Sequence, residues 1–483
     1  MKKRVLALLL IVVLALGGCT SPAQPAQQAA GAGAISFVDD DGATIHLSAP
    51  ARRVISLYSA HTENLYTLGA GEFVIGGHTT CIYPPEAAKT ATFDYAGDPE
   101  TVIAAQPDLV IIRPYIRRKA PDFVKALERA GIPVVSLYPE RYEDFRGYIE
   151  KLAQLVGCEA AAQRELAALE GEIKEIQAKT ATFKERQSVF FEATEVNVRT
   201  ASVGSMAALA IELAGGKNVA AGAEPMTEGS SIAAFGAERV LELVDQIDVY
   251  VSQRGAMNAG GSLEAIQERP GFDTIRAVRD GRVYVLNEKL ISSPTFRYGK
   301  GIRELARFLY PEIFDVVTGV DLKAPATRAG FAELVFKLRH LPLYVPSSSK
   351  YYQTKQTGHT FGLFTDMTWR DASFDAVETA VYGGYLTWER ASDGTEVFHP
   401  TAQVTREALA RAVFLLGNFP GADAKTKISD LAACEKPRIV QTLVDAGVFK
   451  LENGKFSPDR SVTNGEIIAA LETLNTCLTK KQK

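Results

Sequence analysis

The sequence predicts an α/β protein of two lobes, each built on a parallel sheet, joined by a single long helix and followed by a mainly α-helical repeat domain. Short strands that are apolar throughout alternate with helical segments over residues 54–137 and again over 189–309. This alternation is typical of parallel sheets covered on both faces. Between about residues 142 and 183 it gives way to one long helical stretch with apolar residues at helical spacing. Two such halves leave a crevice between them, which is where ligands of open α/β sheets usually bind.

The composition is that of an ordinary soluble protein. Of the 483 residues, 46% are hydrophobic and 23% are charged, and the formal net charge is −4. The length suits two or three domains. The sequence shows no basic run interleaved with aromatic residues, so nucleic acid is not an expected partner.

The first residues are typical of an export signal. Three basic residues at positions 2–4 precede an apolar stretch over 5–16, which is too short to span a bilayer. Leu16-Gly17-Gly18-Cys19 resembles the bacterial lipobox, whose cysteine receives a diacylglyceryl group. We therefore expect a lipoprotein signal peptide over 1–18, lipidation of Cys19 and a flexible tether over 19–34. The protein would be exported and lipid-anchored at the outer face of the cytoplasmic membrane or cell surface. The alternative is an ordinary signal peptide with an incidental cysteine.

Each element of the first predicted lobe has a local signal. The turn Asp41-Gly42 predicts a hairpin between strands at 35–38 and 44–47. Asp98-Pro99-Glu100 predicts a helix start, with aspartate as the cap and proline at the first helical position. Apolar runs predict the strands, and the segments between them predict the helices: strands at 54–57, 73–75, 109–112 and 134–137, and helices from about 62, from 99 and over 122–130.

The second predicted lobe repeats this pattern. Gly215-Gly216 ends a predicted helix at 206–214, and a further helix is expected at 237–244. Apolar runs predict strands at 189–191, 248–251 and 283–286, and a last helix follows at about 301–309.

Several motifs occur in an order that resembles one family. They are the stretch 53–71, Tyr83-Pro84-Pro85-Glu86, the run 97–110, Ala214-Gly215-Gly216-Lys217-Asn218-Val219 and the segment 277–284. Together they resemble periplasmic binding proteins for ferric siderophores, haem and vitamin B12, over a domain of residues 35–315. The resemblance implies two lobes on one rigid helix, capture of a small metal chelate and its delivery to an ABC permease dimer. It implies no enzyme activity and no permanently bound cofactor, and the sequence carries no nucleophile motif, phosphate loop or HExxH helix.

The resemblance also implies two docking carboxylates. In the family's B12-binding member, one carboxylate on each lobe pairs with arginines of the permease subunits. Glu100 falls on the first of these positions and Glu238 resembles the second. One charge on each lobe would orient the protein on a two-fold partner. The alternative is that both glutamates only stabilise the helix starts on which they lie.

The candidate ligand-binding residues follow strands or lie in comparable loops. They are Tyr58, His61, His78, Arg113 and Tyr115 in the first lobe and Arg199, Arg254 and Arg297 in the second. Arginines that converge with tyrosines suit carboxylates or catecholates, because a guanidinium makes paired bonds to such oxygens. This favours a ferric siderophore, or haem bound through its propionates, with His61 or Tyr58 as an axial metal ligand. Cobalamin is less favoured because the B12-binding member has a tryptophan where Arg113 stands. The alternative for His61 is a solvated or capping residue. The basic run 117–119 continues from Arg113 at the edge expected to face the crevice, and its alternative is a solvated face.

Residues 316–483 contain a repeat that resembles S-layer homology (SLH) repeats. Phe364-Thr365-Asp366 and Ile428-Ser429-Asp430 open two units, and helix starts follow Thr327, Thr405 and Thr463. In that family the arginine after the threonine binds anionic cell-wall polysaccharide. Arg328 and Arg406 keep this arginine, whereas Asn464 replaces it, and 344–358 is predicted to be an insertion. The alternative is a repeat domain that packs on the binding domain or on another surface partner. A Cys434–Cys477 disulfide is a further possibility.

The sequence thus predicts a lipid-anchored binding protein for an iron chelate, with cobalamin as the alternative ligand. A rival from another class is a wall-attached structural envelope protein whose binding fold is vestigial. An enzyme is the third option, since related two-lobed folds carry chelatase chemistry, but no catalytic base better than His61 is present.

Overall fold

The computed structural model describes residues 33–346, 358–417, 419 and 424–481, without the side chains of 477–481. The predicted signal peptide, Cys19 and nearly all of the tether lie outside these residues, as does most of the predicted insertion at 344–358. Among the described helices, none is both long and apolar enough to cross a bilayer.

The first lobe, which we call the N-lobe, is built on a five-stranded parallel sheet of order β5-β4-β3-β6-β7. The predicted hairpin is present as the antiparallel pair β1 (Ile35–Val38) and β2 (Thr44–Leu47). Asp98 accepts a hydrogen bond from the Glu100 N–H and Pro99 opens α2, as the sequence predicts. The sheet strands are β3 (Val54–Ser56), β4 (Val74–Gly77), β5 (Ala91–Thr92), β6 (Leu109–Ile112) and β7 (Val134–Ser136), and the helices are α1 (Ser59–Thr67), α2 (Pro99–Ala104), α3 (Pro114–Lys119) and α4 (Pro121–Arg129).

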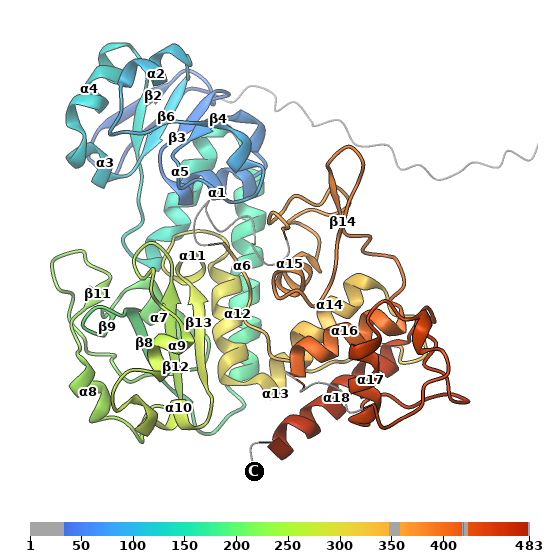
Figure 1. Cartoon of the computed structure of the whole chain (residues 1–483). Helices are drawn as coiled ribbons and strands as arrows, with labels where there is room; N and C mark the ends of the chain where they lie inside the picture. The colour runs from blue at the N-terminus through green and yellow to red at the C-terminus, as the bar shows by residue number, and fades with distance from the viewer. Residues whose placement is uncertain (1–32, 347–357, 418, 420–423, 482–483) are drawn as a thin grey trace, which may run out of the picture.

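The predicted long helix is two helices. α5 (Phe145–Val156) ends at Gly157, whose φ of 70° turns the chain in the left-handed region, and α6 (Glu159–Thr180) begins two residues later. The apolar stripe predicted for this stretch, Leu166, Leu169, Ile173 and Ile176, is buried on α6. Twenty-two residues of α6 give a rod of about 33 Å at 1.5 Å per residue. Figure 1 shows α6 running from the N-lobe down beside the second lobe.

The second lobe, the C-lobe, has a mixed six-stranded sheet. Its path is β11-β9-β8-β12-β13, with β10 also pairing β8. β8, β10, β12 and β13 are parallel, as the sequence predicts, but β9 runs the opposite way and pairs antiparallel with both β8 and β11, which the sequence did not predict. The short turn at 195–198 lets β9 fold straight back on β8, which forces the antiparallel pairing. The strands are β8 (Ser188–Thr194), β9 (Arg199–Ala201), β10 (Lys217–Asn218), β11 (Ile232–Ala233), β12 (Val249–Arg254) and β13 (Val283–Asn287).

Short helices surround this sheet, and α12 lies along α6 (Figure 1). The helices are α7 (Met206–Leu213), α8 (Ala237–Leu241), α9 (Leu263–Gln267), α10 (Arg276–Arg279), α11 (Glu288–Ile291), α12 (Tyr298–Leu309) and α13 (Pro311–Phe314).

The remaining residues form a mainly helical region with its own apolar core, which we call the C-terminal module. Buried phenylalanines, among them Phe331, Phe374 and Phe456, fill that core. The elements are α14 (Arg328–Leu338), α15 (Phe374–Tyr382), α16 (Arg406–Gly417), α17 (Pro437–Asp445), α18 (Asn464–Lys481) and the two-stranded pair β14 (Glu389–Arg390) and β15 (Glu396–Val397).

The C-terminal module is internally repetitive in three dimensions. Thr327, Thr405 and Thr463 each accept a hydrogen bond from the backbone N–H three residues later, at 3.1, 3.2 and 3.2 Å. The three segments before these helices pair with one another through the bridges Pro325↔Thr463, Thr327↔Gln403 and Thr405↔Ser461. The sequence repeat therefore corresponds to three similar helix starts arranged in a ring.

Candidate ligand-binding crevice

Four side chains gather where the N-lobe strands end. Tyr58 follows β3, Arg113 follows β6, Tyr115 lies on α3 and Tyr138 follows β7. The Arg113 guanidinium carbon lies 4.7 Å from the centre of the Tyr58 ring and 4.8 Å from that of Tyr115. The Tyr58 and Tyr138 rings are 6.1 Å apart. We call these four residues the Arg113 cluster; a guanidinium between two phenol rings is held by cation–π attraction.

The Arg113 cluster combines one positive charge with neutral phenols. Burial, and to a lesser extent the neighbouring Tyr138, raises the pKa of Tyr58 far above its usual range. Burial also raises the pKa of Tyr138. Both phenols therefore stay protonated and can donate hydrogen bonds. Such a set of side chains can bind a ligand that carries both an oxyanion group and an apolar ring face.

Sequence reasoning missed Tyr138. The signal was available, because Tyr138 follows the predicted strand at 134–137 in the way Arg113 follows 109–112. Because the carboxyl ends of parallel strands meet at one edge of a sheet, Tyr138 and Arg113 were equally expected to lie at that edge.

His61 lies in the interior and not in the crevice. Its side chain is fully buried, with Nδ1 2.8 Å from the Tyr148 hydroxyl and Nε2 3.1 Å from the Ile112 carbonyl oxygen. A carbonyl can only accept, so Nε2 carries the proton and Nδ1 accepts from Tyr148. Burial lowers the pKa of His61 to about 4. The prediction that His61 faces the crevice as a metal ligand is therefore wrong, because both ring nitrogens are engaged in the core.

Arg297, which the sequence predicts to bind the ligand, is buried at a contact between the lobes. It is 8% exposed, and its guanidinium makes a two-pronged ion pair with Glu63, with Nε–Oε1 and Nη2–Oε2 distances of 2.5 and 2.6 Å. Glu63 is on α1 of the N-lobe, whereas Arg297 directly precedes α12 of the C-lobe. Arg297 therefore joins the two lobes, and Glu63 is a structural residue that the sequence did not identify.

His78 borders a small cavity at the end of β4. Its ring stacks on Tyr95 at 5.3 Å, and its Nδ1 lies 2.9 Å from the Thr80 hydroxyl. The cavity has a volume of about 200 Å³ and is also lined by Cys81 and Ala91. Burial raises the pKa of the Cys81 thiol to about 11, so this cysteine is not a reactive thiolate.

The C-lobe presents Arg254 and Arg199 at the corresponding edge. Arg254 is the last residue of β12 and is exposed, and Arg199 is the first residue of the antiparallel β9 and is half-buried. Both therefore lie where the parallel strands β8 and β12 end.

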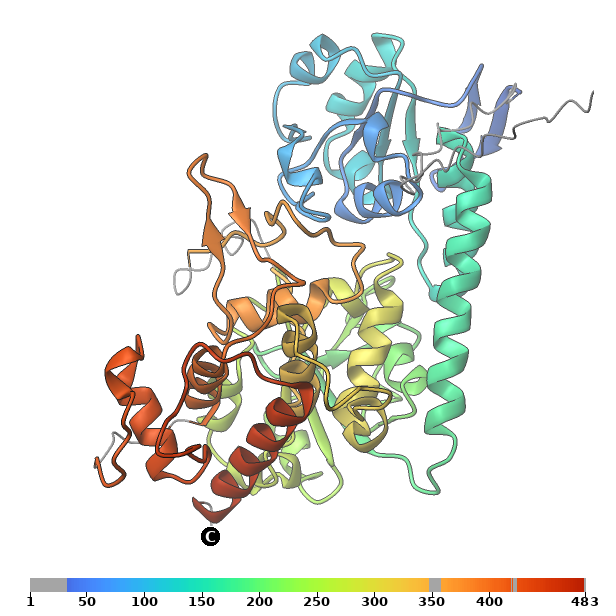
Figure 2. The ribbon, with the colours of Figure 1, turned by 90° about the vertical axis from the view of Figure 1, so that its right-hand side faces the viewer.

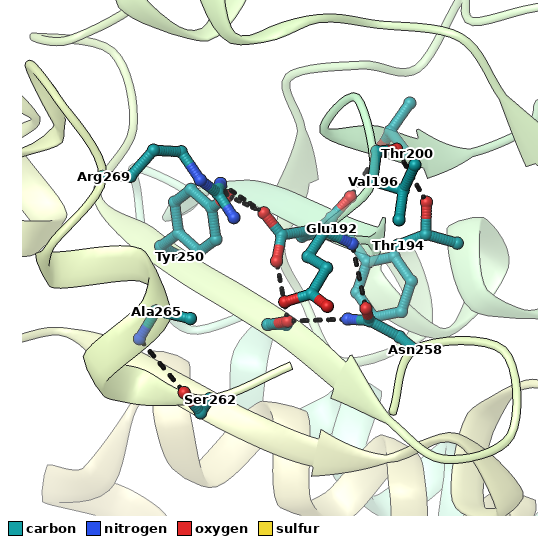
Figure 3. Close-up of polar contacts among 12 residues, drawn as sticks. Glu192, Thr194, Val196, Thr200, Tyr250, Asn258, Ser262, Ala265 and Arg269 are labelled. Atoms are coloured by element: carbon teal, nitrogen blue, oxygen red, sulfur yellow. Dashed lines mark hydrogen bonds and ion pairs between the residues drawn. The ribbon is translucent and has the colours of Figure 1, made fainter. Parts of the chain in front are cut away.

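A buried polar network supports this edge (Figure 3). The carboxylate of Glu192, on β8, is fully buried and accepts from Tyr250 at 2.6 Å, from Ser252 at 3.0 Å and from Arg269 at 2.6 Å. Asn258 joins the network through Ser252 at 3.2 Å and accepts from the Glu195 N–H at 2.9 Å. The network thus ties the loops that follow β8 and β12 to the sheet beneath them.

The two predicted docking glutamates are exposed and lie on different lobes. Glu100 is in the first turn of α2 and Glu238 in the first turn of α8. Figure 1 places α2 in the upper lobe and α8 in the lower lobe. The side chain that caps α2 is Asp98, so the Glu100 carboxylate is not used as the cap.

The two arginines predicted to bind cell wall contact backbone carbonyls of the C-terminal module. Arg328 donates from Nε to the Phe398 carbonyl at 2.8 Å and is half-buried. Arg406 donates from Nη1 to the Phe456 carbonyl at 2.8 Å and is only 6% exposed. Arg406 therefore fixes a turn of the next repeat from a buried position. Cys434 is a free thiol, and the side chain of Cys477 lies outside the described residues.

Residues 54–290 match the family model described as periplasmic binding protein. This part of the chain is similar to periplasmic binding proteins. One relative is the uncharacterized ABC transporter substrate-binding lipoprotein YvrC of Bacillus subtilis, which is 28% identical over 328 residues, 65% of this chain and 99% of the relative. Another is the vitamin B12-binding protein of Vibrio parahaemolyticus, which is 29% identical over 258 residues, 53% of this chain and 88% of the relative.

Solved structures resemble the same part. One is a possible iron-binding periplasmic solute-binding protein from Staphylococcus epidermidis, with 25% identity and a TM-score of 0.47, covering 54% of this chain and 99% of that one. The relatives of this binding domain are substrate-binding proteins of ABC transporters and not enzymes. The family match ends at residue 290, so the C-terminal module lies outside it.

Proposed function

We propose that the protein captures an anionic iron chelate, a ferric siderophore or haem, in the crevice between its lobes and delivers it to an ABC permease. The observation that carries the proposal is Arg113 held between Tyr58 and Tyr115 at the carboxyl end of the N-lobe strands. A guanidinium fixed by its neighbours loses little conformational freedom when it binds a carboxylate or catecholate. Exposed Arg254 on the opposite lobe would supply a second positive charge.

A titration with matched variants tests this site. We expect the purified chain to bind a ferric catecholate or haem, with a visible absorption change, and Arg113→Ala to weaken binding. Loss of a charge-assisted hydrogen bond costs about 1.5–3 kcal/mol, which corresponds to roughly ten- to a hundredfold in Kd. Arg118→Ala is the control, because Arg118 is an exposed arginine of α3, the helix that Arg113 precedes, and lies outside the cluster. Equal effects of the two substitutions would contradict the proposed site.

Cobalamin is the second candidate ligand. A relative of the binding domain is named for vitamin B12, and the tyrosines of the Arg113 cluster could stack on a corrin as well as on a porphyrin. The same titration, carried out with cyanocobalamin, distinguishes the two. Tight binding of cobalamin with no binding of ferric catecholate or haem would replace the iron-chelate proposal. If none of the three binds, the vestigial structural protein becomes the better account.

We further propose the arrangement around this binding domain. Residues 1–18 would be a lipoprotein signal peptide, Cys19 the lipid anchor, 19–34 a tether, 35–315 the binding domain and 316–483 the SLH-like region. Substituting Cys19→Ala should release the protein from the membrane fraction into the soluble fraction, because no lipid could then be attached. Membrane retention of the variant would contradict the anchor.

Attachment to cell-wall polysaccharide is a second proposed activity, for the C-terminal module. What favours it is a cavity of about 300 Å³ where the first and third repeats meet, lined by polar and charged side chains that include Thr327, Glu333, Lys337 and Asn464. Half-buried Arg328 lies at the start of the same helix as Glu333. Co-sedimentation of the full chain with purified wall sacculi tests this, and Lys337→Ala should reduce the bound fraction. Sedimentation that is the same with and without sacculi would exclude it.

A further inference from the structure

The C-terminal module packs directly on the N-lobe. Tyr83 belongs to an N-lobe loop, yet it is 8% exposed and lies in the apolar core of the module, 6.1 Å from the Trp369 ring. Gly362 approaches Pro85 so closely that a Cβ at this position would collide with the proline ring. Arg370 donates to the Tyr66 carbonyl, at the end of α1, at 3.2 Å.

The same module also packs on the C-lobe. Lys300 on α12 forms an ion pair of 2.6 Å with Asp375 on α15. Asn287, which ends β13, donates to the Val345 carbonyl at 2.8 Å. The buried carboxylate of Glu304, on α12, accepts from the Leu343 N–H at 2.8 Å. Figure 1 shows the C-terminal module to the right of the C-lobe, and Figure 2 shows the segment with β14 and β15 rising toward the N-lobe.

The three parts of the molecule meet at Tyr83. The Arg297 guanidinium of the C-lobe lies 3.8 Å from the centre of the Tyr83 ring, while the module packs on that ring through Trp369. Arg297 is at the same time bound to Glu63 of the N-lobe. A change in the spacing of the lobes would therefore have to break contacts of the module as well as the direct contacts between the lobes.

We infer that the C-terminal module is a brace that holds the two lobes at one spacing. A helix such as α6 resists stretching but permits rocking of one lobe against the other about its ends. A third body fixed to both lobes, away from α6, removes that freedom. The inference goes beyond the proposed function, since it concerns the spacing of the lobes and does not depend on which ligand is bound.

The test measures the distance between the lobes in the full chain. Keto amino acids are genetically encoded in place of Lys125 on α4 and Glu264 on α9, and each carries a spin label. Both positions are exposed. Because the label reacts with the keto group, the native thiols stay unlabelled. Pulsed electron paramagnetic resonance should give one narrow distance distribution for the wild-type chain. Gly362→Ala should broaden it and shift its mean, because the new Cβ pushes the module off Pro85.

Gly394→Ala is the matched control. Both glycines have positive φ, 73° and 86°, so both substitutions strain the backbone, but nothing lies within 4 Å of a Cβ at Gly394. The control should keep the narrow distribution. Trp369→Ala, which removes the module's ring from Tyr83 without a backbone change, should broaden it as Gly362→Ala does. Circular dichroism checks that each variant is folded. A narrow, unshifted distribution in Trp369→Ala, or equal broadening by the two glycine variants, would overturn the brace.

Discussion

At the scale of single residues, burial decides which polar side chains serve the site and which serve the fold. Arg113 and Tyr115 remain accessible where the N-lobe strands end, whereas His61 and Arg297 are buried in the protein. Sequence position alone could not separate these cases, since each residue follows a strand or lies in a comparable loop. What separates them is a partner far away in the sequence: Tyr148 for His61 and Glu63 for Arg297.

His61 predicts a loss of stability in acid. Its pKa is lowered by burial to about 4 in the folded protein, against 6.5 for the exposed side chain. The folded state therefore binds this proton less readily, and the stability it contributes is present above about pH 6.5 and is lost as the pH falls toward 4, by at most about 3 kcal/mol. We expect the urea midpoint of the wild-type chain to fall more than that of His61→Gln over this range. His46→Gln, at an exposed position of β2, should follow the wild type; parallel curves for wild type and His61→Gln would contradict the assignment.

The Glu63–Arg297 pair predicts a large penalty for removing one partner. Arg297→Ala leaves a buried carboxylate without its counter-charge, which costs about 3–5 kcal/mol. The half-exposed pair Arg303–Glu172, at 2.7 Å, is the comparison, and Arg303→Ala should cost no more than about 1 kcal/mol. Chemical unfolding of both variants measures the difference. Similar losses would show that the lobe junction does not depend on this ion pair.

At the scale of elements, the sequence predicted which segments are helices and strands better than it predicted how the strands pair and where the helices break. Apolar runs and caps located most strands and helices, because those signals are local. The strands β9 and β11 were missed because each has only two or three residues, and their pairing depends on partners that the local pattern does not show: β9 pairs with β8, and β11 pairs with β9. The break at Gly157 was missed because one glycine within a helical pattern is tolerated in many helices.

Inside the C-terminal module, a buried charge cluster links three elements. His359 is 1% exposed, with Nε2 2.9 Å from Glu378 of α15 and Nδ1 2.5 Å from Glu396 of β15. Arg390 of β14 also pairs with Glu396, at 3.2 Å. Both ring nitrogens face carboxylates, so the ring is held as an imidazolium. Burial lowers the pKa of His359, but the two glutamates outweigh it and the net shift is upward.

This cluster predicts that the module loses stability in base. A histidine with a raised folded pKa contributes stability below its unfolded pKa and loses it as the pH rises through the folded value. Burial raises the pKa of Glu378, which acts in the same direction. The sequence has two tryptophans, Trp369 and Trp388, and both are in the module, so tryptophan fluorescence reports on the module. The fluorescence-detected urea midpoint should fall between about pH 6 and about pH 9 in the wild type. It should change less in His359→Gln, and equal slopes would contradict the cluster's role.

At the scale of the whole molecule, a family binding domain and a separate repeat module form one assembly. The motifs of residues 53–284 predicted the binding domain because they are ordered along the chain as in the family. No local pattern predicted that Tyr83 would enter the core of the module, since this contact joins segments almost three hundred residues apart.

Docking on the permease should depend on both lobes. With the reconstituted permease, Glu100→Gln and Glu238→Gln should each reduce the stimulation of ATP hydrolysis by the loaded protein, mainly by slowing association at moderate ionic strength. Glu264→Gln, an exposed glutamate of α9, is the control. Unchanged stimulation in the double variant would show that these carboxylates only stabilise their helices.

The most direct measurement is the absorption spectrum of the full chain purified from its native cells. The account predicts a Soret band or a ferric charge-transfer band that is lost in Arg113→Ala and kept in Arg118→Ala. A colourless protein that also gains no band on titration with haem or a ferric catecholate would contradict capture of an iron chelate between the lobes.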